Sequence, residues 1–236
     1  MRNRLAKVTL SMIVKNESHR YLRSVLTQLR DWVDEAVIVD DGSTDDTVDI
    51  CQKVLAHIPL KIIRNQQSQF SNEVNLRKQQ WEETIATQPE WILNLDADEW
   101  MESRYQPHLD AILSSCTQDA IYLRLFDMWS ETHYRDDVYW SAHNTYRPFL
   151  IRYKPGFPSV WHEVPQHCGR FPASIHVLPY FLHPCRIKHL GWSNPADRIA
   201  KYRRYMELDP NAKYGWKEQY DSILDESPHL VAWQDE

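Results

Sequence analysis

Two carboxylates one residue apart follow an apolar run in the segment Trp91-Ile-Leu-Asn-Leu-Asp-Ala-Asp-Glu-Trp100. In an extended chain alternate side chains point to the same side, so Asp96 and Asp98 are expected to project together. Carboxylates held this close repel each other unless a positive group lies between them. Mg²⁺ or Mn²⁺ suits that position, because each binds one or two protein carboxylates together with water and substrate phosphate oxygens. The spacing therefore predicts a divalent-metal site, with a solvated acidic loop as the alternative, since Asp-x-Asp alone is a weak motif.

A second acid pair, Asp40 and Asp41, also follows an apolar run. Such runs predict buried strands at 7–14, 36–39, 60–64 and 91–95, and apolar residues at helical spacing predict helices over 18–30, 48–58 and 71–87. This alternation predicts a parallel sheet with right-handed crossovers. Because ligands of such sheets bind beyond the carboxyl ends of the strands, we expect both acid pairs to face one ligand.

Length and composition limit the class of protein. A chain of 236 residues suits one α/β domain. The net charge of −6 argues against a nucleic-acid partner, because such a partner needs a basic surface. With only 5 glycines the chain has no G-x-G-x-x-G or G-x-x-x-x-G-K-[ST] motif, which excludes a phosphate site on a glycine-rich loop.

Cysteine usage and the N-terminal segment bear on location. Cys51, Cys116, Cys168 and Cys185 form no C-x-x-C pair, which favours free thiols in a reducing compartment. The basic start leads into only a short apolar segment, so neither a signal peptide nor a transmembrane helix is expected. We therefore predict a soluble, cytoplasmic protein.

Three segments carry a resemblance to a known family: 11–17 (SMIVKNE), 39–47 (VDDGSTDDT) and 95–100 (LDADEW). In this order and spacing they resemble family 2 glycosyltransferases of the GT-A fold. The resemblance implies an α/β fold with a mostly parallel central sheet flanked by helices and a loop-rich acceptor half. It also implies a nucleotide-sugar donor whose diphosphate is held by Mn²⁺ or Mg²⁺.

The same resemblance implies roles for residues. Asp98 would be the direct metal ligand and Asp96 a secondary one on the ribose side, while Asp41, beside Asp40, would contact the nucleoside. The residues implied in nucleotide-sugar binding are Ile13, Val14, Lys15, Glu17, Asp40, Asp41, Asp96 and Ala97.

One position departs from the family pattern. Related sequences often have Arg-Asn where this chain has Val74-Asn75, with Arg77 two residues further on. The resemblance therefore does not extend to a phosphate-binding role for Asn75 or Arg77.

The second half is less regular. A helix over 104–115 and a strand over 120–126 are predicted, and the aromatic, His and Pro residues of 128–184 are typical of a loop-rich acceptor face. Four tryptophans are candidate sugar-stacking platforms, although large aromatic residues more often serve packing. They are Trp129, Trp140, Trp161 and Trp192.

Two motifs in this half, 160–163 (VWHE) and 187–192 (IKHLGW), resemble the lipopolysaccharide-core glucosyltransferase-like and tetratricopeptide-associated subset of the same family. The resemblance places His189 near the metal or diphosphate and an acidic residue opposite the donor. Inverting transfer needs a carboxylate that takes the proton of the acceptor hydroxyl. We predict Glu163 as this base, with Glu99 and Asp137 as rivals.

The remaining histidines suggest packing. We expect His162, His167 and His183 to be core histidines. A zinc site formed by Cys168, His183, Cys185 and His189 is the alternative, but this spacing matches no structural zinc pattern.

The C-terminal part begins with a predicted helix over 195–208. Its basic residues Lys201, Arg203 and Arg204 predict a solvated face, or a peripheral contact with an anionic membrane at its inner face. We divide the chain into a single domain, 1–209, and a polar, partly irregular tail, 210–236. The domain comprises a nucleotide-sugar half (1–100), an acceptor half (101–194) and the last helix (195–209).

Together these features predict a metal-dependent, inverting glycosyltransferase. Its donor would be a nucleotide sugar, in particular a UDP-sugar, and its acceptor a hydroxyl of a glycan, a lipid-linked glycan or a protein. The alternatives are a non-catalytic, Trp-rich carbohydrate-binding module and a sugar nucleotidyltransferase, whose glycine-rich signature is missing. A phosphatase with Asp96 as nucleophile is disfavoured, because its Asp-x-Asp normally follows the first strand.

Overall fold

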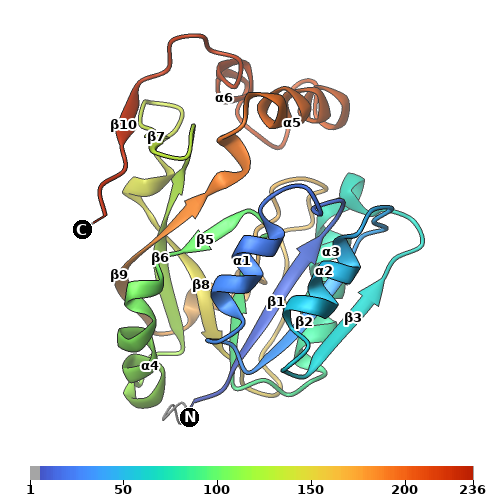
Figure 1. Ribbon diagram of the computed structural model, residues 1–236, viewed down its shortest axis with the longest axis vertical. Helices are drawn as coiled ribbons and strands as arrows, with labels where there is room; N and C mark the ends of the chain where they lie inside the picture. The colour runs from blue at the N-terminus through green and yellow to red at the C-terminus, as the bar shows by residue number, and fades with distance from the viewer. Residues whose placement is uncertain (1–5, 236) are drawn as a thin grey trace.

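The computed structural model describes residues 6–235, which are built around an eight-stranded mixed sheet in the order β3-β2-β1-β4-β8-β6-β9-β5 (Figure 1). The strands of the sheet are β1 (Val8–Val14), β2 (Glu35–Asp40), β3 (Leu60–Arg64), β4 (Trp91–Asn94), β5 (Glu99–Met101), β6 (Ala120–Asp127), β8 (Tyr146–Arg152) and β9 (Tyr180–His189). A separate antiparallel pair joins β7 (His133–Arg135) to β10 (Leu230–Ala232). The predicted α/β class is confirmed.

The first half has the predicted parallel arrangement. β3, β2, β1 and β4 pair in parallel, and α1 (Leu22–Leu29), α2 (Thr47–Val54) and α3 (Glu73–Ile85) connect them. All three predicted helices were too long: the first begins only at Leu22, the second ends at Val54, and the third is preceded by a 3-10 turn, η1 (Phe70–Asn72). Every residue of β1 is buried, as expected for a strand covered on both faces.

Alternate residues of the strands pack against different helices. Leu93 of β4 belongs to the main core, which also contains Leu26 of α1 and Cys51 of α2. Its neighbour Ile92 packs in a second cluster with Trp81 of α3. This alternation follows from the period of two in a strand, and it gives each face of the sheet its own apolar layer.

The second half is more regular than the sequence indicated. Within 128–184, where we expected loops, β8 and β9 take inner positions of the central sheet. The β4–β8, β6–β8 and β5–β9 pairs are antiparallel, whereas β6–β9 is parallel. Helix α4 (Gln106–Ser115) and the 3-10 turns η2 (Ser103–Tyr105), η3 (Ala142–Asn144), η4 (Ala173–Val177) and η5 (Leu190–Trp192) complete this half.

The C-terminal residues are folded onto the second half. Helix α5 (Pro195–Leu208) has the predicted limits, and its first N–H groups are capped by Asn194, whose Oδ1 accepts from the Ala196 N–H at 2.8 Å. The segment expected to be a polar, partly irregular tail instead contains α6 (Lys217–Ser222) and β10. Tyr220 and Ile223 of this segment are only 2% and 1% exposed.

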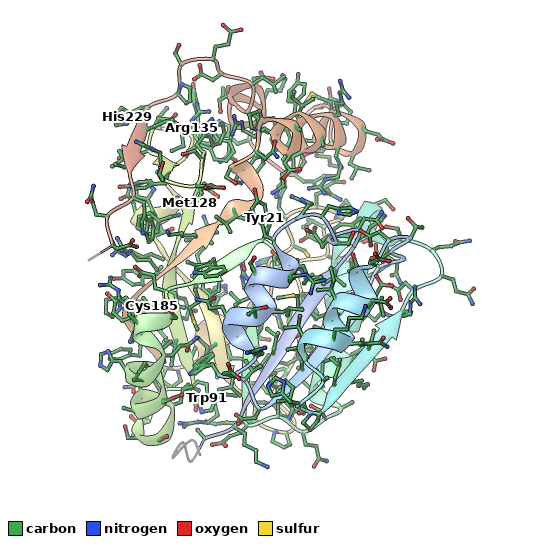
Figure 2. All side chains as sticks on the ribbon, in the orientation of Figure 1. Tyr21, Trp91, Met128, Arg135, Cys185 and His229 are labelled. Carbon is green, nitrogen blue, oxygen red and sulfur yellow. The ribbon has the colours of Figure 1, made fainter. Side chains whose placement is uncertain are left out.

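A buried arginine fixes this C-terminal segment. Arg135, on β7, lies close to His229 near one end of the molecule (Figure 2). Its guanidinium donates to the Ser222 carbonyl at 2.6 Å and to the Asp137 carboxylate at 2.5 Å. Asp137, a rival candidate for the base, also accepts from the backbone of Trp140, so its carboxylate is occupied by structural contacts.

Two further features are the length of the helices and the state of the cysteines. None of the helices within residues 6–235 is long and apolar enough to cross a membrane. The four cysteines are free, as predicted, and Cys51, Cys168 and Cys185 are buried.

Candidate active site

A pocket of about 230 Å³ opens between the carboxyl ends of β1 and β4 and helix α5. We call it the Asp98 pocket. The predicted site residues that line it are Ile13, Lys15, Glu17, Asp96, Ala97, Asp98 and His189. The predicted residues that do not line it are Val14, Asp40, Asp41 and Glu163. Its position at the ends of parallel strands agrees with the expected location of a ligand site in such a sheet.

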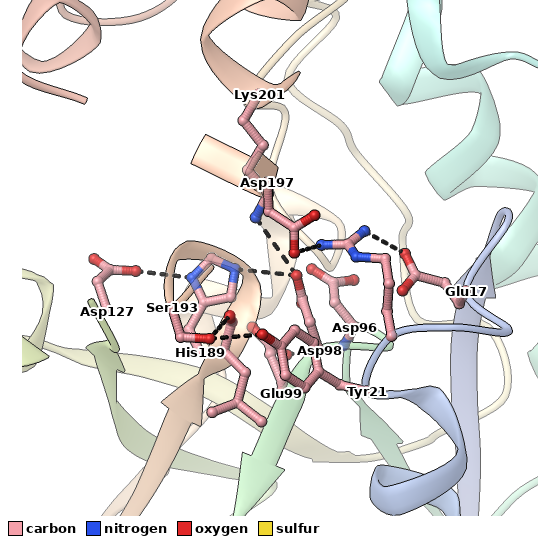
Figure 3. A network of polar contacts seen from close by, with 12 residues as sticks. Glu17, Tyr21, Asp96, Asp98, Glu99, Asp127, His189, Ser193, Asp197 and Lys201 are labelled. Carbon is pink, nitrogen blue, oxygen red and sulfur yellow. Dashed lines mark hydrogen bonds and ion pairs between the residues drawn. The ribbon is translucent and has the colours of Figure 1, made fainter. Parts of the chain in front are cut away.

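Asp98 lies at the centre of a network of charges (Figure 3). Its Oδ2 is 3.6 Å from Nε2 of His189 and 3.5 Å from Nζ of Lys201, and the residue is only 9% exposed. Burial by itself would raise the pKa of Asp98, but the positive charges of Lys201 and His189 hold that pKa well below its usual range. Asp98 is therefore a carboxylate surrounded by cations.

His189 is held between two carboxylates. Its Nδ1–H donates to Oδ1 of Asp127 at 2.8 Å, while Nε2 faces Asp98. Burial would lower the pKa of His189, but Asp98 and Asp127 raise it to about 9. The β5–β9 pairing positions the ring, because it sets His189 opposite Glu99, the residue that follows Asp98.

Asp96 is held differently from Asp98. Arg77 Nη2 donates to both of its carboxylate oxygens, at 3.0 and 3.3 Å. Burial opposes ionisation, but the Arg77 charge lowers the pKa of Asp96. Arg77 thus reaches the site even though the family resemblance gave it no role. Asn75 is exposed on the same helix.

Glu99 lines the neighbouring cavity that also contains His162, but its carboxylate is held by an ion pair. It is 1% exposed and forms a two-point ion pair with Arg170, at 2.7 and 2.8 Å. Its Oε2 also accepts from the Asp96 N–H at 2.9 Å. Glu99 therefore orders the Asp96 loop, and the rival assignment of Glu99 as base finds no open carboxylate here.

Glu17 and Arg20 form the wall of the pocket that faces α5. Burial raises the pKa of Glu17 to about 7, although Arg20 counteracts this shift. The Arg20 guanidinium donates to Glu17 at 2.9 Å and to Asp197 of α5 at 3.2 Å (Figure 3). The loop after β1 is thereby tied to the last long helix.

Asp40 ends β2 and Asp41 follows it, but both are fully buried and neither lines the Asp98 pocket. The Asp41 oxygens accept from the side chains of Asn65 and Ser68 at 2.9 and 2.5 Å, and from the Gln69 N–H at 2.9 Å. Both acids hold the turns at this edge of the sheet, since Asp40 accepts from the N–H of Ser43 at 3.1 Å. The structure does not bring them together with Asp98.

Glu163 lies outside the pockets. Its side chain is 66% exposed and forms an ion pair with Lys78 at 2.7 Å, whereas the adjacent His162 lines a neighbouring cavity below Asp96. The zinc alternative has no support in residues 6–235, where no three His, Cys, Asp or Glu side chains are grouped to hold a metal. His183 is instead fully buried, as expected for a core histidine, and its Nε2 lies 3.2 Å from Nδ1 of His108.

His167 was predicted to be a core histidine, but it is exposed. It lines the Asp98 pocket and both neighbouring cavities, as does His189. Its backbone has φ of 60°, an unusual value for a residue with a side chain, and its N–H donates to Glu73 at 2.8 Å. Strained backbone of this kind is often found at functional sites. The surrounding sequence has no periodicity that would have indicated this role.

The basic residues of α5 also differ from expectation. Lys201 is not solvated: its side chain is 13% exposed and its ammonium lies 4.3 Å from the centre of the Trp192 ring. Arg204 lines the Asp98 pocket as well, with its guanidinium 5.9 Å from the Phe70 ring. Arg203 alone of the three is exposed outside the pocket.

The sheet, the Asp-x-Asp loop at a strand end and the closing helix together define a fold of the GT-A type. The chain belongs to glycosyltransferase family 2, because residues 9–176 match the family model described as "Glycosyl transferase family 2". The same fold occurs in TarS of S. aureus, which superposes with a TM-score of 0.59 at 16% identity over 92% of this chain and 42% of TarS.

Individual relatives share only moderate sequence identity with this chain. An uncharacterised protein of Mycobacterium tuberculosis is 26% identical over 91% of this chain and 54% of its own length. A glycosyltransferase of Rickettsia conorii is 33% identical over 48% of this chain and 36% of its own length. The chain thus spans about half, or less, of the length of these relatives.

Proposed function

We propose that this protein transfers a sugar from a UDP-sugar to an acceptor hydroxyl, with inversion at the anomeric carbon. The observation that carries the proposal is the convergence of Asp98, His189 and Lys201 at one end of the Asp98 pocket. Support for the donor comes from TarS, whose residues 1–349 were crystallised with UDP and with UDP-GlcNAc and share this fold with TM-scores of 0.55 and 0.51.

The two ends of the pocket suit the two ends of a nucleotide. Ile13, Leu76 and Phe70 give an apolar surface for a flat base, and the Lys15 ammonium lies 5.6 Å from the Phe70 ring. Lys201 of α5 brings positive charge to the other end, beside Asp98, while Arg204 lies near the Phe70 ring. Cations in a largely enclosed site bind phosphate oxygens strongly, because such charge-assisted hydrogen bonds are poorly screened.

The site fits a divalent cation. Asp98 offers a carboxylate oxygen and His189 an imidazole nitrogen 3.6 Å away, and Asp127 holds the far nitrogen of that ring, as is typical of histidine metal ligands. Mg²⁺ or Mn²⁺ needs few protein ligands when phosphates and water complete its shell. Within residues 6–235 Asp96 is not grouped with Asp98 and His189 as a three-residue ligand set, so it would have to turn from Arg77 to act as the secondary ligand. When bound, the ion would neutralise charge on the diphosphate and remove the attraction that keeps His189 protonated.

In the reaction the acceptor oxygen forms a bond to the anomeric carbon as the bond from that carbon to the diphosphate breaks. The charge that develops on the departing diphosphate would face Lys201, which lies beside Asp98. The hydroxyl proton passes to a carboxylate on the acceptor side, for which we retain Glu163 as the candidate. Glu163 lines neither the Asp98 pocket nor the two neighbouring cavities, so in this role its carboxylate must leave the ion pair with Lys78 and turn toward the acceptor hydroxyl.

Thermal unfolding in the presence of nucleotides tests the donor assignment. A ligand that binds only the folded state, at 100 times its dissociation constant, adds about 2.7 kcal/mol, which corresponds to roughly 5–10 °C for a chain of this size. We expect UDP with Mn²⁺ to give such a shift, and ADP, GDP and CDP to give smaller ones. Absence of a shift with every nucleoside diphosphate, with or without Mn²⁺, would reject the proposal.

The same experiment separates the alternatives. A carbohydrate-binding module would be stabilised by free sugars but not by nucleotides, and a sugar nucleotidyltransferase would bind nucleoside triphosphates better than diphosphates. The likeness to the lipopolysaccharide-core subset, the cytoplasmic location and a peripheral membrane contact stay predictions.

A further inference from the structure

A second cavity, of about 500 Å³, adjoins the Asp98 pocket on the side of β6 and α6. The two share His167, His189, Trp192 and Tyr205, so a group bound in one lies next to a group bound in the other. We call the second cavity the aromatic pocket. The proposed binding of the donor does not occupy this pocket.

Its wall consists of packed aromatic rings. Trp140 and Trp192 meet edge to face with ring centres 4.9 Å apart, and both are almost completely buried. Trp216, which precedes α6, packs on Tyr139 at 5.0 Å yet stays 44% exposed. The buried rings therefore give rigidity, while Trp216 presents an apolar surface at the mouth of the pocket.

The polar groups of the pocket are mostly neutral. Ser141 and Thr145 bring hydroxyl groups and Gln219 an amide, whereas the charged side chains, apart from its histidines, are Asp127 and Arg147. Asp127 is paired with His189, so Arg147 is the charged side chain left beside that pair among the residues that line the pocket. A single cation among aromatic and neutral polar groups does not form the cluster of positive charge that an anionic headgroup or a strongly charged peptide would need.

His167 stands at the junction with the Asp98 pocket, and a relay fixes its tautomer. The Asp209 carboxylate can only accept, so the Tyr220 hydroxyl donates to it at 3.2 Å. The Tyr220 oxygen then accepts from Nε2–H of His167 at 2.7 Å. In the tautomer with hydrogen on Nε2, Nδ1 of His167 is a hydrogen-bond acceptor, and the residue lines both cavities.

We propose that the aromatic pocket binds a neutral sugar unit of the acceptor, stacked on Trp216, with its reactive hydroxyl directed past His167 toward the Asp98 pocket. The inference rests on the proposed function and names its acceptor class. An apolar ring surface beside neutral hydrogen-bonding groups suits a sugar, which has C–H faces and a rim of hydroxyls. An acceptor of this kind would be a glycan rather than a lipid phosphate or a polypeptide.

Saturation-transfer NMR on the full chain saturated with UDP and Mn²⁺ tests this assignment. The probes are lactose, maltotriose and chitotriose, with glucose 6-phosphate and phosphatidylglycerol vesicles as anionic comparisons. We expect NMR saturation transfer from the protein to at least one neutral sugar. The dissociation constant for that sugar should be at least tenfold higher in Trp216→Ala than in the wild-type protein. Trp216→Tyr should restore most of the affinity. The matched control is Tyr180→Ala, which removes an aromatic residue that is 54% exposed and outside both pockets.

The outcomes separate the two proposals. If UDP binds but none of the three neutral sugars receives saturation from the protein, the acceptor assignment is overturned. Equal sugar affinities of Trp216→Ala and Tyr180→Ala would overturn it as well. A preference for glucose 6-phosphate or for the vesicles would overturn it in favour of an anionic acceptor. Failure of the wild-type protein to bind UDP would instead reject the proposed function itself.

Discussion

The ammonium of Lys201 lies 3.5 Å from Oδ2 of Asp98, although 103 positions separate the two residues in the chain. Asp98 follows β4 in the first half, and Lys201 comes from α5. No residue of α5 is fully buried, and the helix is held over the pocket by polar contacts such as this one and the Arg20–Asp197 pair, together with the packing of Tyr202 and Tyr205 on a tryptophan cluster. The contact makes α5 part of the nucleotide site.

Replacing Lys201 by methionine is expected to weaken UDP binding about 10- to 100-fold, because a hydrogen bond to a charged group contributes about 1.5–3 kcal/mol. Isothermal titration in low salt measures the loss. Arg203→Met is the matched control, since it removes the same charge from an exposed position on the same helix. Equal losses in both variants would show a general charge effect, and no loss in either would exclude a phosphate contact by Lys201.

Asp98→Asn is expected to abolish the part of the UDP affinity that depends on Mn²⁺. A fall in unfolding free energy of about 1–3 kcal/mol should accompany it, because Lys201 and His189 lose a largely buried charged partner. Titration with and without EDTA gives the first quantity and urea unfolding the second. Undiminished Mn²⁺-dependent affinity would contradict the assignment of Asp98 as metal ligand.

Asp127→Asn tests whether His189 is a metal ligand that is oriented by the hydrogen bond from its Nδ1–H to Asp127. Loss of the partner of a ligating histidine typically costs 10- to 100-fold in metal affinity, and we expect that loss for Mn²⁺ with UDP bound. UDP affinity in EDTA should change little, which distinguishes a positioning role from general damage to the pocket. If Mn²⁺ affinity is unchanged, His189 is not a metal ligand that depends on Asp127.

Glu163→Gln is expected to leave Mn²⁺-dependent UDP binding intact and to lower sugar transfer at least a hundredfold, in line with the 10²- to 10⁴-fold contribution of a general base. Lys78→Met is the control, because it breaks the same ion pair but keeps the carboxylate. Near-normal transfer by Glu163→Gln would exclude Glu163 as the base.

His183 predicts a pH dependence of stability. Burial, reinforced by His108, lowers the pKa of His183 to about 4, below the ordinary value of 6.5. Between these two values the unfolded chain binds more protons than the folded one, so this contribution to stability is complete above pH 6.5 and is lost as the pH falls toward 4. The slope is at most about 1.4 kcal/mol per pH unit. Urea unfolding from pH 7 to pH 4.5 should show a shallower loss in His183→Gln; identical slopes would contradict the assignment.

The strands of the first half could be predicted because they are buried on both faces and are therefore almost uniformly apolar. The strands β8 and β9 gave no such signal. β8 begins with the exposed residues Tyr146 and Arg147 and contains Pro148, while β9 begins with three exposed residues and contains Pro184. Mixed burial along one strand produces a mixed sequence, which a pattern of alternating or continuous apolar residues does not describe.

The site was predictable only where its chemistry is local. Asp96 and Asp98 share one short segment, and His189 lies in a motif similar to those of a known family. Lys201 and His167 reach the site through tertiary contacts alone, and nothing in their sequence neighbourhood distinguishes them from surface or core residues. Asp41 shows the converse case, since its position in a motif did not reveal that its carboxylate is bound by Asn65, Ser68 and the chain beside them.

The register of one three-residue strand determines how the site tolerates changes in chain length. β5 pairs with β9 so that Glu99 lies opposite His189. A substitution at Trp100, in the middle of β5, leaves this backbone pairing in place. Insertion or deletion of one residue there shifts β5 by one position along β9, which moves Asp98 relative to His189, because β6 keeps His189 opposite Asp127. A scan of single-residue deletions and substitutions across β5, read out by Mn²⁺-dependent UDP binding, should therefore find every deletion inactive and Trp100 substitutions tolerated.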